Sequence, residues 1–155
     1  MISALCAGLI CLVAVAAAAE VRFKGRGIDP KCKTLSSVTF HPCTIGFEAR
    51  RQNDRVVKVR DFRFGFFRAE GDCGGGRGYI GSGGDDLKPF GVRRDRRFNT
   101  SQLIHDGDTR VIIRGRFRRS YRFAVGTIRI RSGGSDGRSF GCDTGVQEWR
   151  SHVAG

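Results

Sequence analysis

Apolar and charged residues alternate along the last third of the chain. In the run from position 111 to 117, arginine fills most of the alternate positions. The apolar positions between them are Val111, Ile113, Gly115 and Phe117. Successive side chains of a strand point to opposite faces, so the pattern predicts a half-buried strand whose outer face is basic.

The next run repeats this alternation. Its inward positions are Ala124, Gly126, Ile128 and Ile130. Because Arg118–Ser120 fits a short turn between the two runs, the pair is predicted to be an antiparallel hairpin. Gly115 and Gly126 would let a facing side chain or a neighbouring backbone approach closely.

The hairpin is followed by a turn and a predicted closing strand. Ser132–Gly137 is rich in glycine and contains Asp-Gly, which adopts positive φ easily, so it predicts a turn. Phe140–Arg150 then predicts one strand that carries Cys142 and Trp149. Trp149 is interpreted as a core residue and Thr144–Gly145 as a bulge.

Further strands are predicted before this region at Thr44–Arg50, Val56–Arg68 and Phe98–Ile104, with a turn at Gln52–Asp54. The strand Val56–Arg68 is expected to be central. Before Arg60–Asp61 its expected core residues stand at odd positions, Val57 and Val59. After it they stand at even positions, Phe62, Phe64 and Phe66. A β-bulge there would keep both sets on one face.

Glu70–Asp86 is rich in glycine and is predicted to be a flexible surface loop. It contains a literal G-x-G-x-x-G at Gly76, Gly78 and Gly81. That motif binds a dinucleotide only where it leads from a strand into a helix, and the Ser-Gly-Gly-Asp-Asp that follows does not start one.

The predicted fold class is all-β: a single antiparallel β-sandwich or partly open barrel of six to eight strands, stapled by disulfides. After position 19 the chain is poor in leucine and rich in Phe, Val and Gly, which favours strands. The expected divisions are a signal peptide at 1–19, an N-terminal arm and first strand with a short disulfide loop at 20–43, a β domain at 44–150 and a tail at 151–155.

The segment Ile2–Ala19 is small and apolar and ends in three alanines, which resembles a secretory signal with its cleavage site. It predicts a secreted or envelope-associated protein without a stable membrane anchor after cleavage, although the run is nearly long enough to span a bilayer. Four cysteines then remain, and in an exported chain they predict disulfides. Of the three pairings, we favour Cys32 with Cys43 and Cys73 with Cys142.

The formal net charge of the 155 residues is +13, and 23 of the 28 basic residues are arginine. This predicts an anionic partner, such as an acidic polymer or a cell-envelope component; nucleic acid is not expected for an exported chain. A compositional bias towards arginine is the alternative explanation. The residues expected to bind form two groups: Arg93, Arg94, Arg96 and Arg97, and then Arg114, Arg116, Arg118, Arg119 and Arg122.

No catalytic, metal or cofactor site is predicted. His41, His105 and His152 lie in unrelated contexts, and Asp143 is explained by capping a turn. The predicted function is therefore a secreted, non-catalytic β domain that binds anionic envelope or extracellular polymers. A protein-interaction or inhibitor-like domain presenting the glycine-rich segment is the alternative, and a hydrolase ranks behind both.

Several pieces of the chain recur in an order found elsewhere. They are a strand ending in cysteine (Val59–Cys73), a short Phe strand (Arg97–Phe98), hydrophobic-x-Gly-x-Phe (Ile113–Phe117), Ala-x-Gly-Thr-x-Arg (Ala124–Arg129) and Cys-Asp-Thr-Gly-x-x-x-Trp (Cys142–Trp149). Together they resemble a family of secreted, β-rich domains of actinobacterial type, over about Thr44–Arg150. The resemblance supports pairing Cys73 with Cys142 and implies no activity, because that family has no established role.

Overall fold

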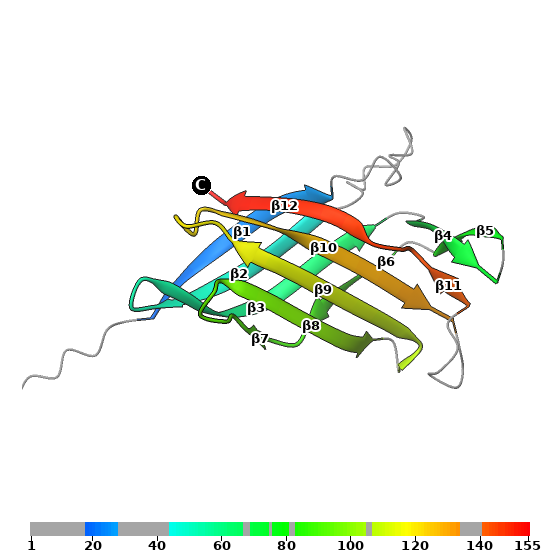
Figure 1. Cartoon of the computed structure of the whole chain (residues 1–155), viewed down its shortest axis with the longest axis horizontal. Helices are drawn as coiled ribbons and strands as arrows, with labels where there is room; N and C mark the ends of the chain where they lie inside the picture. Colours follow the sequence, from blue (N-terminus) through cyan, green and yellow to red (C-terminus); the bar gives the residue numbers. More distant parts are fainter. Residues whose placement is uncertain are drawn as a thin grey trace, which may run out of the picture.

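The structure is a computed structural model that describes residues 18–27, 44–66, 69–74, 76–80, 83–104, 107–133 and 141–155. These residues form twelve strands of one antiparallel sheet, which curls into a half-barrel (Figure 1). Several predictions lie outside the described residues: the Cys32–Cys43 pair, nearly all of the signal segment and most of the turn at Ser132–Gly137.

The strands are β1 (Ala19–Gly27), β2 (Thr44–Gln52), β3 (Arg55–Phe66), β4 (Ala69–Cys73), β5 (Arg77–Ile80), β6 (Gly83–Leu87), β7 (Phe90–Gly91), β8 (Arg97–Ile104), β9 (Thr109–Phe117), β10 (Phe123–Ser132), β11 (Cys142–Asp143) and β12 (Gln147–Val153). The main path through the sheet runs β8, β9, β10, β12, β1, β2 and β3. Strands β6 and β7 pair with β3, while β11 joins β10 to β4 and β5.

The predicted hairpin of the last third is confirmed. Strands β9 and β10 pair antiparallel, with Phe117 opposite Ala124 and Gly115 opposite Gly126. The inward parity is the predicted one, since Val111, Ile113 and Phe117 are buried and the arginines between them are exposed. The turn is held by the Arg118 N–H, which donates to the Phe123 carbonyl at 2.9 Å.

The bulge in β3 is confirmed at Asp61, which has a φ of 47°. The register with β2 shifts here, so that Val59 and Phe62 both point into the core. A second shift, opposite Arg50 and Arg51, was not predicted. It makes Val56 the core residue and leaves Val57 half-buried, so the predicted inward position of Val57 is wrong.

Three predictions about extent are corrected. The sheet has twelve strands rather than six to eight, and a sandwich is not confirmed because all twelve belong to a single sheet. The region after position 19, expected to be an N-terminal arm and first strand, begins with β1, which is an inner strand paired with both β2 and β12. At the other end β12 continues to Val153, past the expected boundary at 150.

The predicted closing strand is divided, and the predicted glycine loop is largely strand. Strands β11 and β12 both pair with β10, and one extra residue lies between them, beside Gly145, which has a φ of 65°. The predicted bulge at Thr144–Gly145 is therefore confirmed, and across it the neighbouring strand on the other side changes from β4 to β1. The segment Glu70–Asp86 supplies most of β4, β5 and β6. Among its described residues the G-x-G-x-x-G glycines adjoin strands rather than a helix.

The half-barrel encloses a core of aromatic and β-branched side chains. Trp149 is fully buried against three phenylalanines, Phe47, Phe62 and Phe98, with ring centroids about 6 Å apart. A Cβ atom on Gly126 would lie 2.5 Å from Cζ2 of Trp149, and one on Gly115 would lie 3.1 Å from it. The predicted close approach is present at both glycines, and closer still than the indole are the Arg114 carbonyl oxygen at Gly126 and the Phe98 ring at Gly115.

Candidate anion-binding face

The outer surface of β8, β9, β10 and β12 carries the arginines at the centre of the site, and we call it the arginine face. Arg97 of β8 lies directly opposite Arg116 of β9. Because the N–H of Phe117 donates to the carbonyl of Arg96 at 3.0 Å, this is a non-hydrogen-bonded pair, the type in which facing side chains are closer. The two exposed guanidinium groups are therefore direct cross-strand neighbours on the same face of the sheet.

The register extends this row across the sheet. Arg116 lies opposite Val125 of β10, and Val125 lies opposite Arg150 of β12. The N–H of Val153 donates to the carbonyl of Arg122 at 3.0 Å, which makes Val125 and Arg150 another close, non-hydrogen-bonded pair. The short Val125 side chain thus separates two cations.

A depression of about 380 Å³ lies over this row. We call it the central depression; its lining includes Arg97, Arg114, Arg116, Arg118, Arg150 and one acid, Glu148. Arg114, Arg116, Arg118 and Arg150 form no ion pair with a described residue, while Arg97 lies 3.9 Å from Asp95. The lining is thus strongly positive and open to solvent.

The structure brings together parts of both predicted arginine groups. Arg97 of the first joins Arg114, Arg116 and Arg118 of the second, and a neighbouring hollow adds Arg96 and Arg119. The remaining predicted residues, Arg93, Arg94 and Arg122, are exposed but line neither hollow.

Arg150 was missing from the predicted site. Its outward position was visible in the sequence, since it alternates with the buried Trp149 and Ser151. What the sequence does not give is the register that places β12 beside β10 and so brings Arg150 next to Val125.

Asp143 forms a separate, structural cluster with Arg129 and Arg131 of β10, at the end of the arginine face next to β11. Its carboxylate accepts hydrogen bonds from Arg129 Nε and Nη2 and from the Gly145 N–H, and Arg131 Nε lies 3.1 Å away. The hydrogen bond from Arg129, reinforced by Gly145 and by both positive charges, lowers the pKa of Asp143 despite its partial burial. The predicted turn-capping role is confirmed, because the bond to Gly145 closes the turn between β11 and β12.

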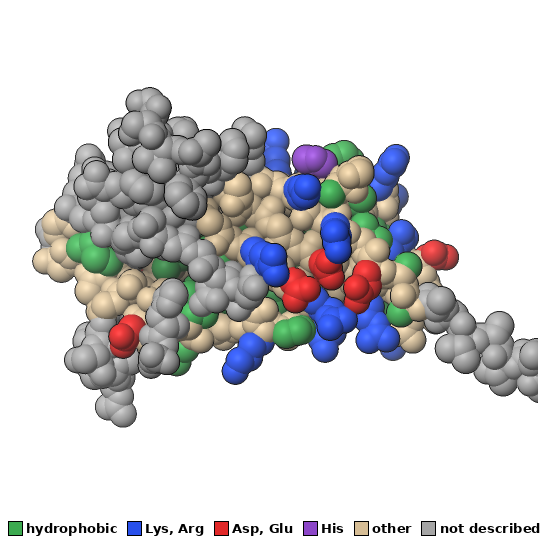
Figure 2. All heavy atoms as spheres, turned by 180° about the vertical axis from the view of Figure 1, so that it is seen from behind, with side chains coloured by type: hydrophobic (Ala, Val, Ile, Leu, Met, Phe, Trp, Pro, Cys, Tyr) green, Lys and Arg blue, Asp and Glu red, His purple; other side chains and the backbone are tan. Residues whose placement is uncertain are grey.

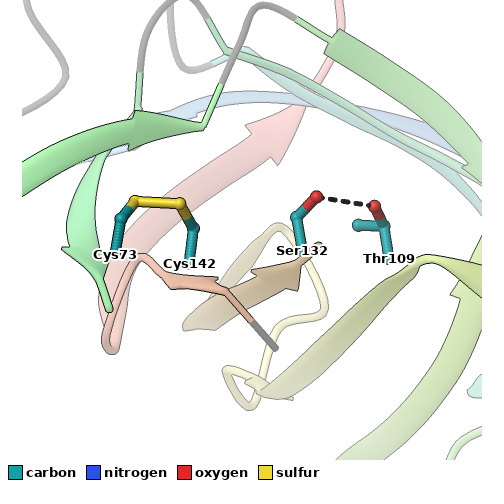
Figure 3. The surroundings of a disulfide bond; sticks show 4 residues. All are labelled: Cys73, Thr109, Ser132 and Cys142. Atoms are coloured by element: carbon teal, nitrogen blue, oxygen red, sulfur yellow. Dashed lines mark hydrogen bonds between the residues drawn. A yellow bond between two sulfur atoms is a disulfide. The ribbon is translucent and has the colours of Figure 1, made fainter. Parts of the chain in front are cut away.

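The predicted disulfide between Cys73 and Cys142 is present and links β4 to β11. Figure 3 shows it close to the end of the β9–β10 hairpin, where the Thr109 hydroxyl lies 3.1 Å from that of Ser132. The bond closes a sequence separation of 69 residues. It is compatible with an extracellular location.

Within the described segments, no helix is long and apolar enough to cross a membrane. No group of three or more His, Cys, Asp or Glu residues in the same segments is placed to hold a metal ion. In comparisons with known proteins, no family model, no curated protein and no solved structure matches the chain. The resemblance to secreted β-rich domains therefore stays a prediction.

Proposed function

We propose that this protein is a non-catalytic binding module of the cell envelope or extracellular space that holds an acidic polymer on its arginine face. The observation that carries the proposal is the row formed by Arg97, Arg116 and Arg150, in which Arg97 faces Arg116, Arg150 follows across Val125, and no acid lies in the row itself. Guanidinium forks bind phosphate and carboxylate groups through two parallel hydrogen bonds, so such a row favours a ligand with repeated negative charges.

The spacing of the arginines also fits an extended ligand. Arg114, Arg116 and Arg118 are two residues apart along one strand direction, which separates their Cα atoms by about 6.8 Å each. Neighbouring strands add a second spacing of about 4.8 Å. A polymer that crosses this grid contacts several cations at once, and each contact increases its residence time.

Stacking makes no contribution in the central depression. The one aromatic side chain in its lining, Trp149, is fully buried beneath the glycines. Single-stranded nucleic acids are usually held by exposed aromatic platforms as well as by cations. The arrangement therefore favours a polymer recognised through its charges.

The direct test is retention of the oxidised protein, from position 20 onward, on immobilised polymers over a salt gradient. The panel contains DNA, linear polyphosphate, a teichoic-type phosphate polymer, an acidic polysaccharide and peptidoglycan. We expect one acidic polymer to retain the protein at about 150 mM salt, with affinity falling steeply as salt rises. Weak retention on every anion alike, lost well below that concentration, would contradict the proposal.

Two charge-matched variants separate a specific face from total charge. The triple variant Arg97→Gln, Arg116→Gln, Arg150→Gln removes three cations from the central depression. The control Lys24→Gln, Arg50→Gln, Lys58→Gln removes three exposed cations from β1, β2 and β3. We expect the first variant to lose selective retention and the control to keep it. Equal losses in both would show that only the overall charge matters.

A further inference from the structure

A second hollow of about 520 Å³ lies beside the central depression, where the turn before β8 meets the turn between β9 and β10. We call it the turn hollow. Its polar lining consists of Asp95, Arg96, Arg97, Arg116, Arg118 and Arg119, and the buried ring of Phe117 lies behind them. Five guanidinium groups thus surround a space of molecular size with one carboxylate among them.

The backbone at Arg96 is held in an unfavourable conformation. Its φ is 67°, in the left-handed region where residues other than Gly, Asn and Asp are uncommon. Three hydrogen bonds hold the turn. The backbone N–H of Arg96 donates to the Arg93 carbonyl, and the Arg96 carbonyl accepts from the N–H of Phe117. The Asp95 carboxylate accepts from the N–H of Arg97. Glycine would adopt this conformation without strain, yet the chain places a half-buried arginine here.

The charges in the turn hollow are poorly balanced. Asp95 lies 3.8 Å from Arg93 Nε and 3.9 Å from Arg97 Nε, so its charge is shared between these two. Arg96, Arg116, Arg118 and Arg119 make no ion pair with a described residue. Like charges directly opposite each other, as at Arg97 and Arg116, destabilise a sheet, and an anion bound between them would relieve that repulsion.

We propose that the turn hollow binds a compact phosphoryl oxyanion with at least about two negative charges: inorganic phosphate, pyrophosphate or a terminal phosphate monoester. A tetrahedral phosphoryl group offers three acceptor oxygens, and it can satisfy several guanidinium forks converging from different strands. The ligand is free phosphate or pyrophosphate, or the phosphorylated end of the polymer whose body crosses the central depression. In the second case this site rests on the proposed function and gives the arginine face a polarity, with the chain end at Arg96.

The test measures pyrophosphate and orthophosphate binding by titration calorimetry at about 150 mM sodium chloride, with acetate as the monovalent comparison. The variant Arg96→Gly removes the guanidinium and the backbone strain together. We expect at least tenfold weaker pyrophosphate binding, as for loss of a charged hydrogen-bond donor. We also expect a melting temperature equal to or a few degrees above that of the parent. Asparagine also tolerates positive φ but is less flexible than glycine. The variant Arg96→Asn should therefore bind pyrophosphate as weakly as Arg96→Gly, which shows that the loss does not come from a more flexible turn.

The matched control is Arg94→Gln, which removes one charge from the same turn at an exposed residue outside both hollows. It should keep the parent affinity for pyrophosphate. If Arg94→Gln weakens binding as much as Arg96→Gly, or if acetate binds as tightly as pyrophosphate, the site does not exist as proposed.

The source of the phosphoryl group is resolved with poly(glycerol phosphate) oligomers that carry or lack a terminal phosphomonoester. Preference for the phosphorylated end, lost in Arg96→Gly, assigns the hollow to the polymer end; equal binding of both oligomers together with tight pyrophosphate binding assigns it to the free ion. If polymer is retained by the parent while no phosphate compound depends on Arg96, this inference fails and the proposed function stands. If pyrophosphate binds in an Arg96-dependent way but no polymer is retained, this inference stands and the proposed function fails.

Discussion

The two sides of the half-barrel differ in whether acids accompany their facing cations. On the side formed by β1, β2 and β3, Arg50 lies opposite Lys58, but Glu20 lies opposite Arg50 in the same row. In another row on the outer surface of these strands, Arg22 lies opposite Glu48, and Glu48 lies opposite Arg60. Ion pairs join Arg22 to Glu48 at 3.0 Å and Arg60 to Glu20 at 2.9 Å. Figure 2, seen from behind, shows acidic side chains among basic ones on this side. We call it the paired face.

The row of facing residues on the arginine face contains no acid. There the facing residues are Arg97 and Arg116, and the next cation in the row, Arg150, follows across Val125. A compositional bias towards arginine would add cations to both faces, but it would not decide whether acids accompany them. The contrast between the faces therefore supports a functional origin for the unpaired arginines.

The largest effect is expected from a variant that introduces an ion pair into the unpaired row of the arginine face. Arg97→Glu places a carboxylate opposite Arg116 and removes a contact for the polymer. We expect affinity for the retained polymer to fall on the order of 100-fold, as for loss of a charged interface group. The free energy of unfolding should stay equal or rise by up to ~1 kcal/mol, because repulsion becomes attraction. Polymer retention and chemical denaturation measure the two effects.

Arg94→Glu serves as the control for this reversal. It changes the net charge by the same amount at an exposed residue outside both hollows. Comparable losses of affinity in both variants would contradict a defined face, and a clear loss of stability in Arg97→Glu would contradict the repulsion between Arg97 and Arg116.

One end of the arginine face, next to β11, does hold paired arginines, which separates a structural role for arginine from the unpaired row. Asp143 holds Arg129 and Arg131, and its side chain is only 21 % exposed. Asp143→Asn keeps the shape but removes the charge, so we expect a loss of about 2 kcal/mol in the free energy of unfolding at neutral pH. Polymer affinity should hardly change, because Asp143 lines neither hollow.

The pH dependence of stability follows from the direction of the shift. The pKa of Asp143 is lowered in the folded protein, chiefly by the hydrogen bond from Arg129. The stabilisation is therefore complete above the pKa of an unfolded aspartate and is lost as the pH falls below ~4, through the folded pKa. Denaturation curves between about pH 2 and 7 should show a smaller acid-induced loss in Asp143→Asn than in the parent. Identical slopes would contradict this role.

Local features of the fold were predictable because each has a short-range signal. Alternation at positions 111–117 fixed the inward residues of β9, and the parity change at Asp61 located the bulge in β3. Long-range pairing carries no such signal. Nothing local indicates that β1 is an inner strand between β2 and β12, or that β11 pairs with β4 while β12 pairs with β1.

The candidate site shows the same division. The arginines were visible as two clusters, but their union depends on the register between β8 and β9, which places Arg97 beside Arg116. Two further residues depend on the tertiary structure. Arg150 joins the site through the pairing of β12 with β10. Arg96 is singled out by its positive φ, which the sequence does not reveal.

The ion pairs of the paired face can be tested by substituting their central acid. Glu48→Arg would place three cations in one cross-strand row with Arg22 and Arg60, so we expect a loss of about 1 kcal/mol in the free energy of unfolding. Glu48→Gln, which removes the acid without adding a cation, should cost less than half of that. The two variants are compared by urea denaturation. Equal costs would indicate that packing of the side chain, rather than charge order, stabilises this row.

The smallest expected effect concerns the free protein in salt. Sodium chloride shortens the range of charge interactions to about 10 Å at 0.1 M, and it weakens repulsion on the arginine face and attraction on the paired face together. Exposed ion pairs contribute little, so the repulsion should dominate. The parent should therefore gain a few tenths of a kcal/mol between about 20 and 300 mM salt. Arg97→Glu should gain less, because it has one repulsive pair fewer. Thermal unfolding at matched salt concentrations checks both, and a parent that loses stability with added salt would show that attraction on the paired face outweighs the unpaired arginines.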